Sequence, residues 1–137
     1  MLILKILAVL TALYLLYLLT IGVNRFTLKR YNYLFINTLT LSTSLGGYAA
    51  SVGGYFWYMT ALQNHADILN GQILMGIGAL LLLYTLYKNI MHTDETIGLI
   101  LTVVQQVIYL VAGVIGLILI CLIFLAYSDA KPVYRIN

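Results

Sequence analysis

The sequence predicts an all-α integral membrane protein: a four-transmembrane-helix, up-down bundle with short loops. Two totals and one pattern lead to this class. Of the 137 residues, 63% are hydrophobic and only 8% are charged, whereas a soluble domain carries about 25% charged residues. The charged residues also fall between apolar runs that each reach the roughly 20 residues needed to cross a bilayer. A single domain, residues 1–137, is expected because the helices leave no residues for a second.

Four apolar runs give the expected spans. The first covers residues 1–23 and is followed by a polar segment that contains Arg25. Lys5 ahead of an apolar stretch also suits a signal peptide, but the small residues of a cleavage site are missing around residues 20–23, so we expect an uncleaved helix. Because the connections are only a few residues long, neighbouring helices should pack antiparallel. The other three spans are residues 33–62, 68–87 and 97–127.

The basic residues lie near the ends of the apolar runs or between them instead of clustering on one face. This pattern suits lipid headgroups and membrane orientation, and we expect no nucleic-acid partner. The densest cluster, Arg25, Lys29 and Arg30, predicts a cytoplasmic loop that contacts headgroups, with both termini on the opposite side. The short loops and small size favour a bacterial inner membrane. The basic residues that oppose this orientation are Lys5, Lys131 and Arg135.

The second run carries a polar stripe with helical spacing. Residues with hydrogen-bonding side chains recur in steps of three or four and so share one helix face. The fourth run carries a weaker stripe of the same kind. An unpaired polar group in hydrocarbon is costly, so the two stripes should face protein or water, most simply each other. The residues expected to face a ligand or a partner are Asn37, Thr40, Ser44, Tyr48, Ser51, Tyr55, Gln106 and Tyr109.

Small residues form another face of the second run and recur in the fourth. Gly46, Ala50 and Gly54 follow one another at four-residue spacing, and Gly113 and Gly116 lie within the last apolar run. Small side chains allow two membrane helices to approach closely. These five positions are therefore expected to be helix-packing sites.

The residue types that carry catalysis or bind cofactors are sparse and poorly placed. His65 and His92 flank the third run, about 40 Å apart in a helix, so they cannot ligate one haem together. Motifs of hydrolases, zinc proteases and nucleotide-binding loops are missing. We expect no cofactor and no metal, and the sequence leans against an enzyme. The four acidic residues all lie at expected helix ends, unlike the buried carboxylate of a proton-coupled transporter: Asp67, Asp94, Glu95 and Asp129.

Three functions fit these features. The first is a non-catalytic subunit or assembly partner of a membrane complex, bound to other membrane subunits or to itself, which the minimal loops and several small-residue faces favour. The second is a small homo-oligomeric channel or transporter with a hydroxyl-lined path on the second helix. A third, weaker alternative is a lipid-handling membrane protein that uses the basic residues at the interface. The sequence favours the first.

Overall fold

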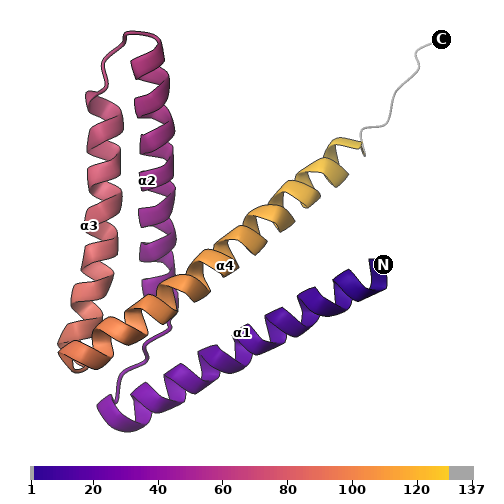
Figure 1. Cartoon of the computed structure of the whole chain (residues 1–137), viewed down its shortest axis with the longest axis vertical. Helices are drawn as coiled ribbons and strands as arrows, with labels where there is room; N and C mark the ends of the chain where they lie inside the picture. Colours follow the sequence, from indigo (N-terminus) through magenta and orange to yellow (C-terminus); the bar gives the residue numbers. More distant parts are fainter. Residues whose placement is uncertain (1, 130–137) are drawn as a thin grey trace.

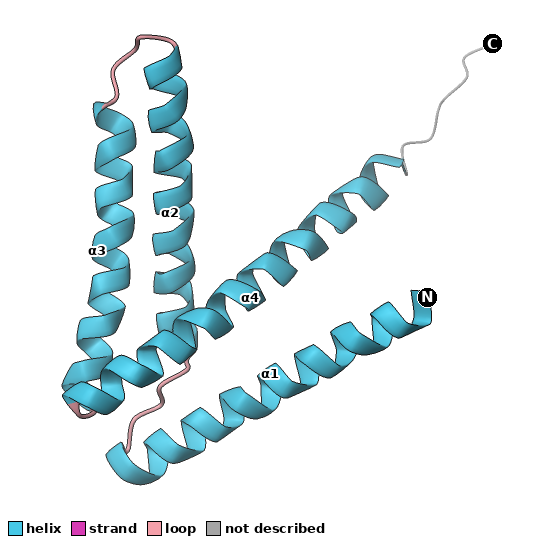
Figure 2. Ribbon diagram, in the orientation of Figure 1, coloured by secondary structure: helices cyan, strands magenta, loops and turns pink. Residues whose placement is uncertain are grey.

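The computed structural model describes residues 2–129 and consists of four α-helices. Figure 1 shows one pair of helices as a tight hairpin and the other two as arms that diverge from its lower end. Figure 2 shows that short connections join the helices. Over residues 2–129, the prediction of an all-helical fold with four helices is confirmed. Lys131 and Arg135 lie outside the described residues. The helices are α1 (Leu2–Tyr31), α2 (Thr38–Gln63), α3 (Leu69–His92) and α4 (Glu95–Asp129).

Three of the helices, α1, α3 and α4, are long and apolar enough to cross a membrane. The second helix was expected to be a span as well, but α2 does not reach the same apolar character. Four glycines and a series of serines and threonines lower its hydropathy. In lipid, α2 would therefore depend on neighbouring helices to cover its polar groups.

The first helix continues beyond residue 23, where the apolar run ends, as far as Tyr31. Polar side chains in this extension bond to the chain itself, since Thr27 Oγ1 donates to Val23 O at 3.0 Å. The helix ends at Asn32, which has a φ of 51° and whose N–H donates to Leu28 O at 3.1 Å. Asparagine tolerates this left-handed conformation and commonly terminates helices in this way.

Glycines bring α2 and α3 into backbone contact. A Cβ atom added at Gly47 would lie 3.0 Å from Gly78 O, and one at Gly54 would lie 2.9 Å from Gly71 O. On the other side of the contact, a Cβ at Gly71 or Gly78 would lie 2.6 Å from a backbone atom of α2. The glycines are seven residues apart on each helix, so two turns separate the Gly47–Gly78 pair from the Gly54–Gly71 pair. We call these four residues the glycine seam.

The five positions expected to pack against another helix differ in their surroundings. Gly54 lies in the glycine seam, and a Cβ at Gly113 would be 2.9 Å from a leucine methyl group of α2. Ala50 is half-buried. A Cβ at Gly46 would reach only a leucine methyl group at 4.0 Å, and one at Gly116 would have no atom within 4 Å. On α2 the close approach is made by Gly47 and Gly54, which are seven residues apart. Gly46, which the four-residue spacing selected, lies beside this contact and not in it.

The C-terminal end of α1 is attached to the loop that precedes α2. Asn24 Nδ2 donates to Ile36 O at 2.9 Å, and Asn24 Oδ1 accepts from Ile36 N at 2.7 Å. The Tyr31 hydroxyl donates to Asp94 Oδ2 at 2.5 Å. These contacts hold α1 at the end of the molecule where α2 begins, α3 ends and α4 begins. We call this end the neck.

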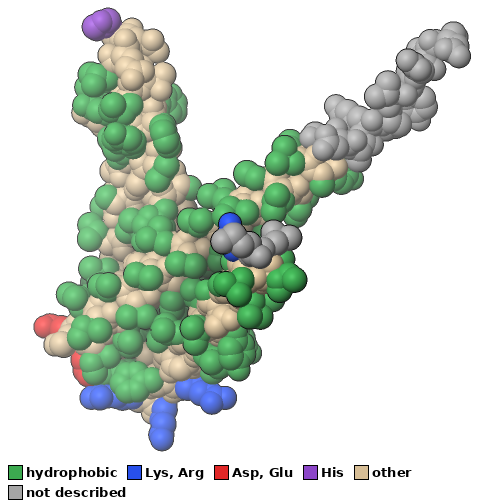
Figure 3. All heavy atoms as spheres, turned by 45° about the vertical axis from the view of Figure 1, so that its right-hand side comes forward, with side chains coloured by type: hydrophobic (Ala, Val, Ile, Leu, Met, Phe, Trp, Pro, Cys, Tyr) green, Lys and Arg blue, Asp and Glu red, His purple; other side chains and the backbone are tan. Residues whose placement is uncertain are grey.

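Basic side chains gather at the neck. Figure 3 shows lysine and arginine side chains at this end, while hydrophobic side chains are spread along the helices. Arg25, Lys29 and Arg30 are all exposed. Arg30 lies 3.9 Å from Asp94, but both partners are more than half exposed, so this ion pair adds little stability. Contact of the three basic residues with lipid headgroups stays a prediction.

The link between Asn24 and Ile36 gives a first testable consequence. We expect Asn24→Ala to destabilise the junction by about 2 kcal/mol, because the N–H and C=O of Ile36 both lose their partner. Hydrogen exchange of the protein in detergent should accelerate over residues 24–36. Arg25→Ala, which truncates the exposed neighbour, should leave exchange in this segment unchanged. Equal exchange in the two variants would contradict the assignment.

Candidate functional site

The interior of the neck is polar. Buried hydrophobic side chains are few among the described residues, and Phe35, Ile108 and Tyr109 are the largest of them. Soluble proteins place apolar groups inside, so an interior of this kind suits a molecule whose surroundings are apolar. The buried polar residues are Thr27, Thr40, Ser44, Thr85, Asn89, Thr102 and Gln105.

Gln105 of α4 is the centre of this polar group and is 0% exposed. Its Nε2 donates to Phe35 O at 2.7 Å and lies 3.2 Å from Thr40 Oγ1 and 3.1 Å from Tyr109 OH. Its Oε1 accepts from Asn89 Nδ2 at 2.6 Å. Thr40 Oγ1 and the Tyr109 hydroxyl are 2.6 Å apart. One amide thus connects α4 to α2, to α3 and to the loop that follows α1.

Asn89, at the end of α3, is the second centre. Its Nδ2 also donates to Thr102 Oγ1 at 3.0 Å, and its Oδ1 accepts from the Tyr33 hydroxyl at 3.4 Å. Burial raises the pKa of Tyr33 above its ordinary value of 10.0, so the phenol keeps the proton that it donates. The Tyr33 ring stacks on His92 with 4.5 Å between ring centroids. Asn89 therefore ties α3 to α4 and to the α1–α2 loop.

The polar stripes of α2 and α4 meet at the neck. Gln106 Nε2 donates to Ser44 Oγ at 3.1 Å, and the Tyr48 hydroxyl donates to Gln106 Oε1 at 2.8 Å. With the contact between Thr40 and Tyr109, three successive stripe residues of α2 reach α4. The polar side chains in the N-terminal half of the α2 stripe therefore bond to other residues of the same chain.

The remaining stripe residues lie in three other environments. Asn37 is the N-cap of α2: its Oδ1 accepts from Thr40 N at 2.9 Å, and Thr40 Oγ1 accepts from Asn37 N at 3.3 Å. Such a reciprocal pair satisfies two backbone donors at a helix start. Ser51 faces Gly78 across the glycine seam, and Tyr55 is exposed. The structure therefore does not gather the eight predicted residues at one place.

The buried polar side chains of the neck are all hydrogen-bonded. Among the described residues, no buried side-chain nitrogen or oxygen lacks a hydrogen-bond partner. A groove of about 500 Å³ lies beside the neck, lined by leucines and valines of α3 and α4 and by Tyr48, Thr102 and Gln106. These three polar side chains already bond to protein groups. The groove therefore offers a ligand mainly apolar contact.

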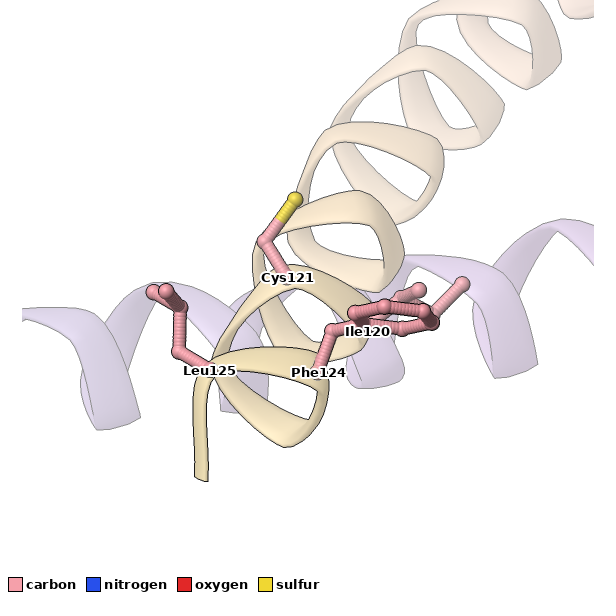
Figure 4. A pocket seen from close by; sticks show the side chains of 4 residues that line it. All are labelled: Ile120, Cys121, Phe124 and Leu125. Atoms are coloured by element: carbon pink, nitrogen blue, oxygen red, sulfur yellow. The ribbon is translucent and has the colours of Figure 1, made fainter. Parts of the chain in front are cut away.

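A second hollow, of about 440 Å³, lies far along α4. Figure 4 shows the four side chains that line it, Ile120, Cys121, Phe124 and Leu125, all on one helix. It is an apolar helix surface that carries one thiol. Within the part of the chain that the structure describes, no three side chains of His, Cys, Asp or Glu gather as a metal site would require.

Neither of the two central amides was among the residues expected to face a ligand or a partner. Asn89 and Gln105 were visible as polar residues in apolar runs, and Gln105 stands next to the selected Gln106. Their role depends on Phe35 O and on the crossing of α3 with α4, which residue spacing does not encode. The signal that could have identified them is the presence of an amide side chain inside an apolar run, because a buried amide requires a hydrogen-bond partner. No protein-family model, curated protein or solved structure matches this chain.

Proposed function

We propose that the chain is a multi-pass protein of a bacterial inner membrane and a non-catalytic subunit or assembly partner of a membrane complex. All four helices cross the bilayer in this proposal, with α2 crossing as a hairpin with α3. The neck lies on the cytoplasmic side, where Arg25, Lys29 and Arg30 contact lipid headgroups. The short connections and small size favour a bacterial inner membrane over other membranes.

The membrane assignment is supported by the distribution of polarity. Three helices have the required length and apolar character. The weakly apolar α2 is about 39 Å long at 1.5 Å per residue, enough to span a hydrocarbon core of about 30 Å. Its packing against α3 through the glycine seam and its bonds to α4 cover part of its polar stripe. Crossing as a hairpin therefore removes much of the cost of inserting α2.

The proposed role rests on one observation: each buried polar side-chain atom of the neck already has a hydrogen-bond partner within the described residues. A catalytic or transport site requires polar groups that are free to meet a substrate. The arms and the outer face of the hairpin instead present aliphatic and aromatic side chains. A neighbouring protein helix in the same bilayer is the kind of partner that such a surface fits.

Purification from native membranes tests the role. The tagged chain, extracted in a mild detergent after chemical crosslinking, should carry stoichiometric partner subunits that mass spectrometry identifies. Recovery as a lone monomer without crosslinked partners would overturn the proposal. Complete extraction from membranes by alkaline carbonate would overturn the membrane assignment itself.

Replacing polar stripe residues separates an assembly partner from a channel. Because Ser44 is bonded to Gln106 and Asn37 caps α2, we expect the Asn37→Ala, Ser44→Ala, Ser51→Ala variant to lose about 1–3 kcal/mol of stability. Partner recovery should fall in step with folding, and liposomes containing either protein should show the same low solute flux. Flux that the wild type supports and the folded variant lacks would favour a homo-oligomeric channel.

A further inference from the structure

The N-terminal half of α1 carries two tyrosines that the rest of the described chain does not cover. Tyr14 and Tyr17 are each 61% exposed. Neither hydroxyl has a hydrogen-bond partner among the described residues. The nearby Thr11 differs, because its hydroxyl donates to Leu7 O at 2.8 Å and needs no other partner. The two phenols are thus the hydroxyls of this half-helix that lack a partner within the described part of the chain.

The position of the phenols along α1 distinguishes them from tyrosines that anchor a helix at a membrane surface. Lys5 and Arg25 are 20 residues apart, which is about 30 Å of helix and matches the hydrocarbon core. Tyr14 lies roughly midway between them, with Tyr17 one turn away. Interfacial tyrosines sit at headgroup level, whereas these two lie near the middle of the bilayer once α1 is inserted. A phenol at that depth requires a hydrogen-bonding partner from protein.

The α1 surface around the phenols is exposed, since Leu10, Leu13 and Leu18 are exposed as well. Leu16, Thr20 and Val23, which are partly shielded, lie on another face. The one partly shielded side chain on the helix face between the two tyrosine positions, Ile21, lies one turn closer to the neck. The attachment of α1 runs through Asn24 and Tyr31 at its C-terminal end. A partner can therefore cover Tyr14 and Tyr17 without disturbing the neck.

The chemistry of a phenol allows two copies of the same group to pair. A phenol both donates and accepts, so the same group on a second molecule completes it. Two copies inserted in the same orientation place each tyrosine opposite its counterpart at the same depth, as a two-fold interface requires. We propose that α1 pairs in parallel with α1 of a second copy of this chain, with the hydroxyls of Tyr14 and Tyr17 hydrogen-bonded across the interface. This inference rests on the proposed insertion of α1 into the membrane.

Disulfide crosslinking in native membranes tests the facing surface. In a Cys121→Ser background, Leu10→Cys places a thiol on the tyrosine face, and Ala12→Cys places one on the opposite face at nearly the same depth. Oxidation should yield covalent dimers of the Leu10→Cys protein and not of the Ala12→Cys protein. Equal crosslinking at both positions, or none at either, would overturn the proposal.

Energy transfer between labelled copies in lipid vesicles tests the hydroxyls. The Tyr14→Phe, Tyr17→Phe protein keeps both rings, so its helix content and membrane integration should match the wild type. Its dissociation constant should rise about five- to tenfold, as loss of two interhelical hydrogen bonds implies. The Tyr84→Phe, Tyr87→Phe protein removes two exposed phenols with the same spacing from α3 and should associate like the wild type.

The outcomes separate this inference from the proposed function. Loss of the wild-type protein from membranes under alkaline extraction would overturn both the α1 interface and the proposed function. Integration without α1 pairing, or association of the Phe variant equal to that of the wild type, would overturn the α1 interface alone. Crosslinking of Leu10→Cys only to a different protein would also overturn it, while leaving the role as an assembly partner intact.

Discussion

Gly78→Ala should open the α2–α3 hairpin, whereas Gly76→Ala should leave it intact. A Cβ at Gly78 would lie 2.6 Å from Gly47 O and 2.7 Å from Ser51 N, and both are backbone atoms that cannot rotate away. A Cβ at Gly76 would meet no atom within 4 Å. The two positions are two residues apart on α3, so the same methyl group is added to the same helix on opposite sides. We expect Gly78→Ala to cost about 1–3 kcal/mol, as overpacking of a tight interface does.

The comparison between the two variants separates packing from helix propensity. Alanine favours a helix over glycine by about 1 kcal/mol at either position, so Gly76→Ala should be neutral or stabilising. The single tryptophan of the chain, Trp57, lies on α2 beside Ile73 and Leu74 of α3. Its fluorescence during unfolding in mixed detergent micelles therefore reports separation of the hairpin. A midpoint for Gly78→Ala equal to that of Gly76→Ala would show that the seam tolerates a wider spacing.

The helices could be read from the sequence because each is a long apolar run between polar segments. The limits of α1 could not, because the apolar run ends at residue 23 whereas the helix continues to Tyr31. Asn24, the first polar residue after the run, lies inside the helix and its amide bonds to Ile36. The spacing that aligned Asn37 with the stripe residues is also the spacing of a capping box. Residue spacing alone therefore could not distinguish a helix cap from a position facing a partner.

The glycine seam and the directions of α1 and α4 show a second limit of prediction from residue spacing. Both the four-residue spacing that begins at Gly46 and the seven-residue spacing that begins at Gly47 place small residues on one face, and the choice depends on how α3 is placed. Likewise, apolar runs fix how long α1 and α4 are but not the angle at which they leave the hairpin (Figure 1). We infer that the angle between the hairpin and α4 depends on the buried polar side chains at the point where α3 and α4 cross. The amides of Asn89 and Gln105 bond across the helix crossing.

Gln105→Met should therefore make the angle between the hairpin and α4 more variable. The substitution keeps the length of the side chain but removes the donor to Phe35 O and the acceptor of Asn89 Nδ2. Asn89 Nδ2 keeps its bond to Thr102 Oγ1, and Phe35 O keeps a weak contact with Thr40 Oγ1 at 3.4 Å. Because each loses its shorter bond at a buried site, at about 1–3 kcal/mol each, we expect a loss of about 2–4 kcal/mol in total. Gln106→Met is the matched control, since Gln106 is the next residue, is only half-buried and bonds to two hydroxyls. It should cost about 1 kcal/mol.

A distance measurement distinguishes loss of geometry from loss of stability. Spin labels on exposed residues, Leu62 at the far end of α2 and Leu117 on α4, report the separation of hairpin and arm in a Cys121→Ser background. The distance distribution should broaden for Gln105→Met and keep its width for Gln106→Met. Equal widths would mean that the contacts of Ser44, Tyr48 and Tyr109 suffice to hold α4. A broad distribution confined to Gln105→Met would mean that a single amide, bonded to three other segments, sets the shape that the arms present to a partner.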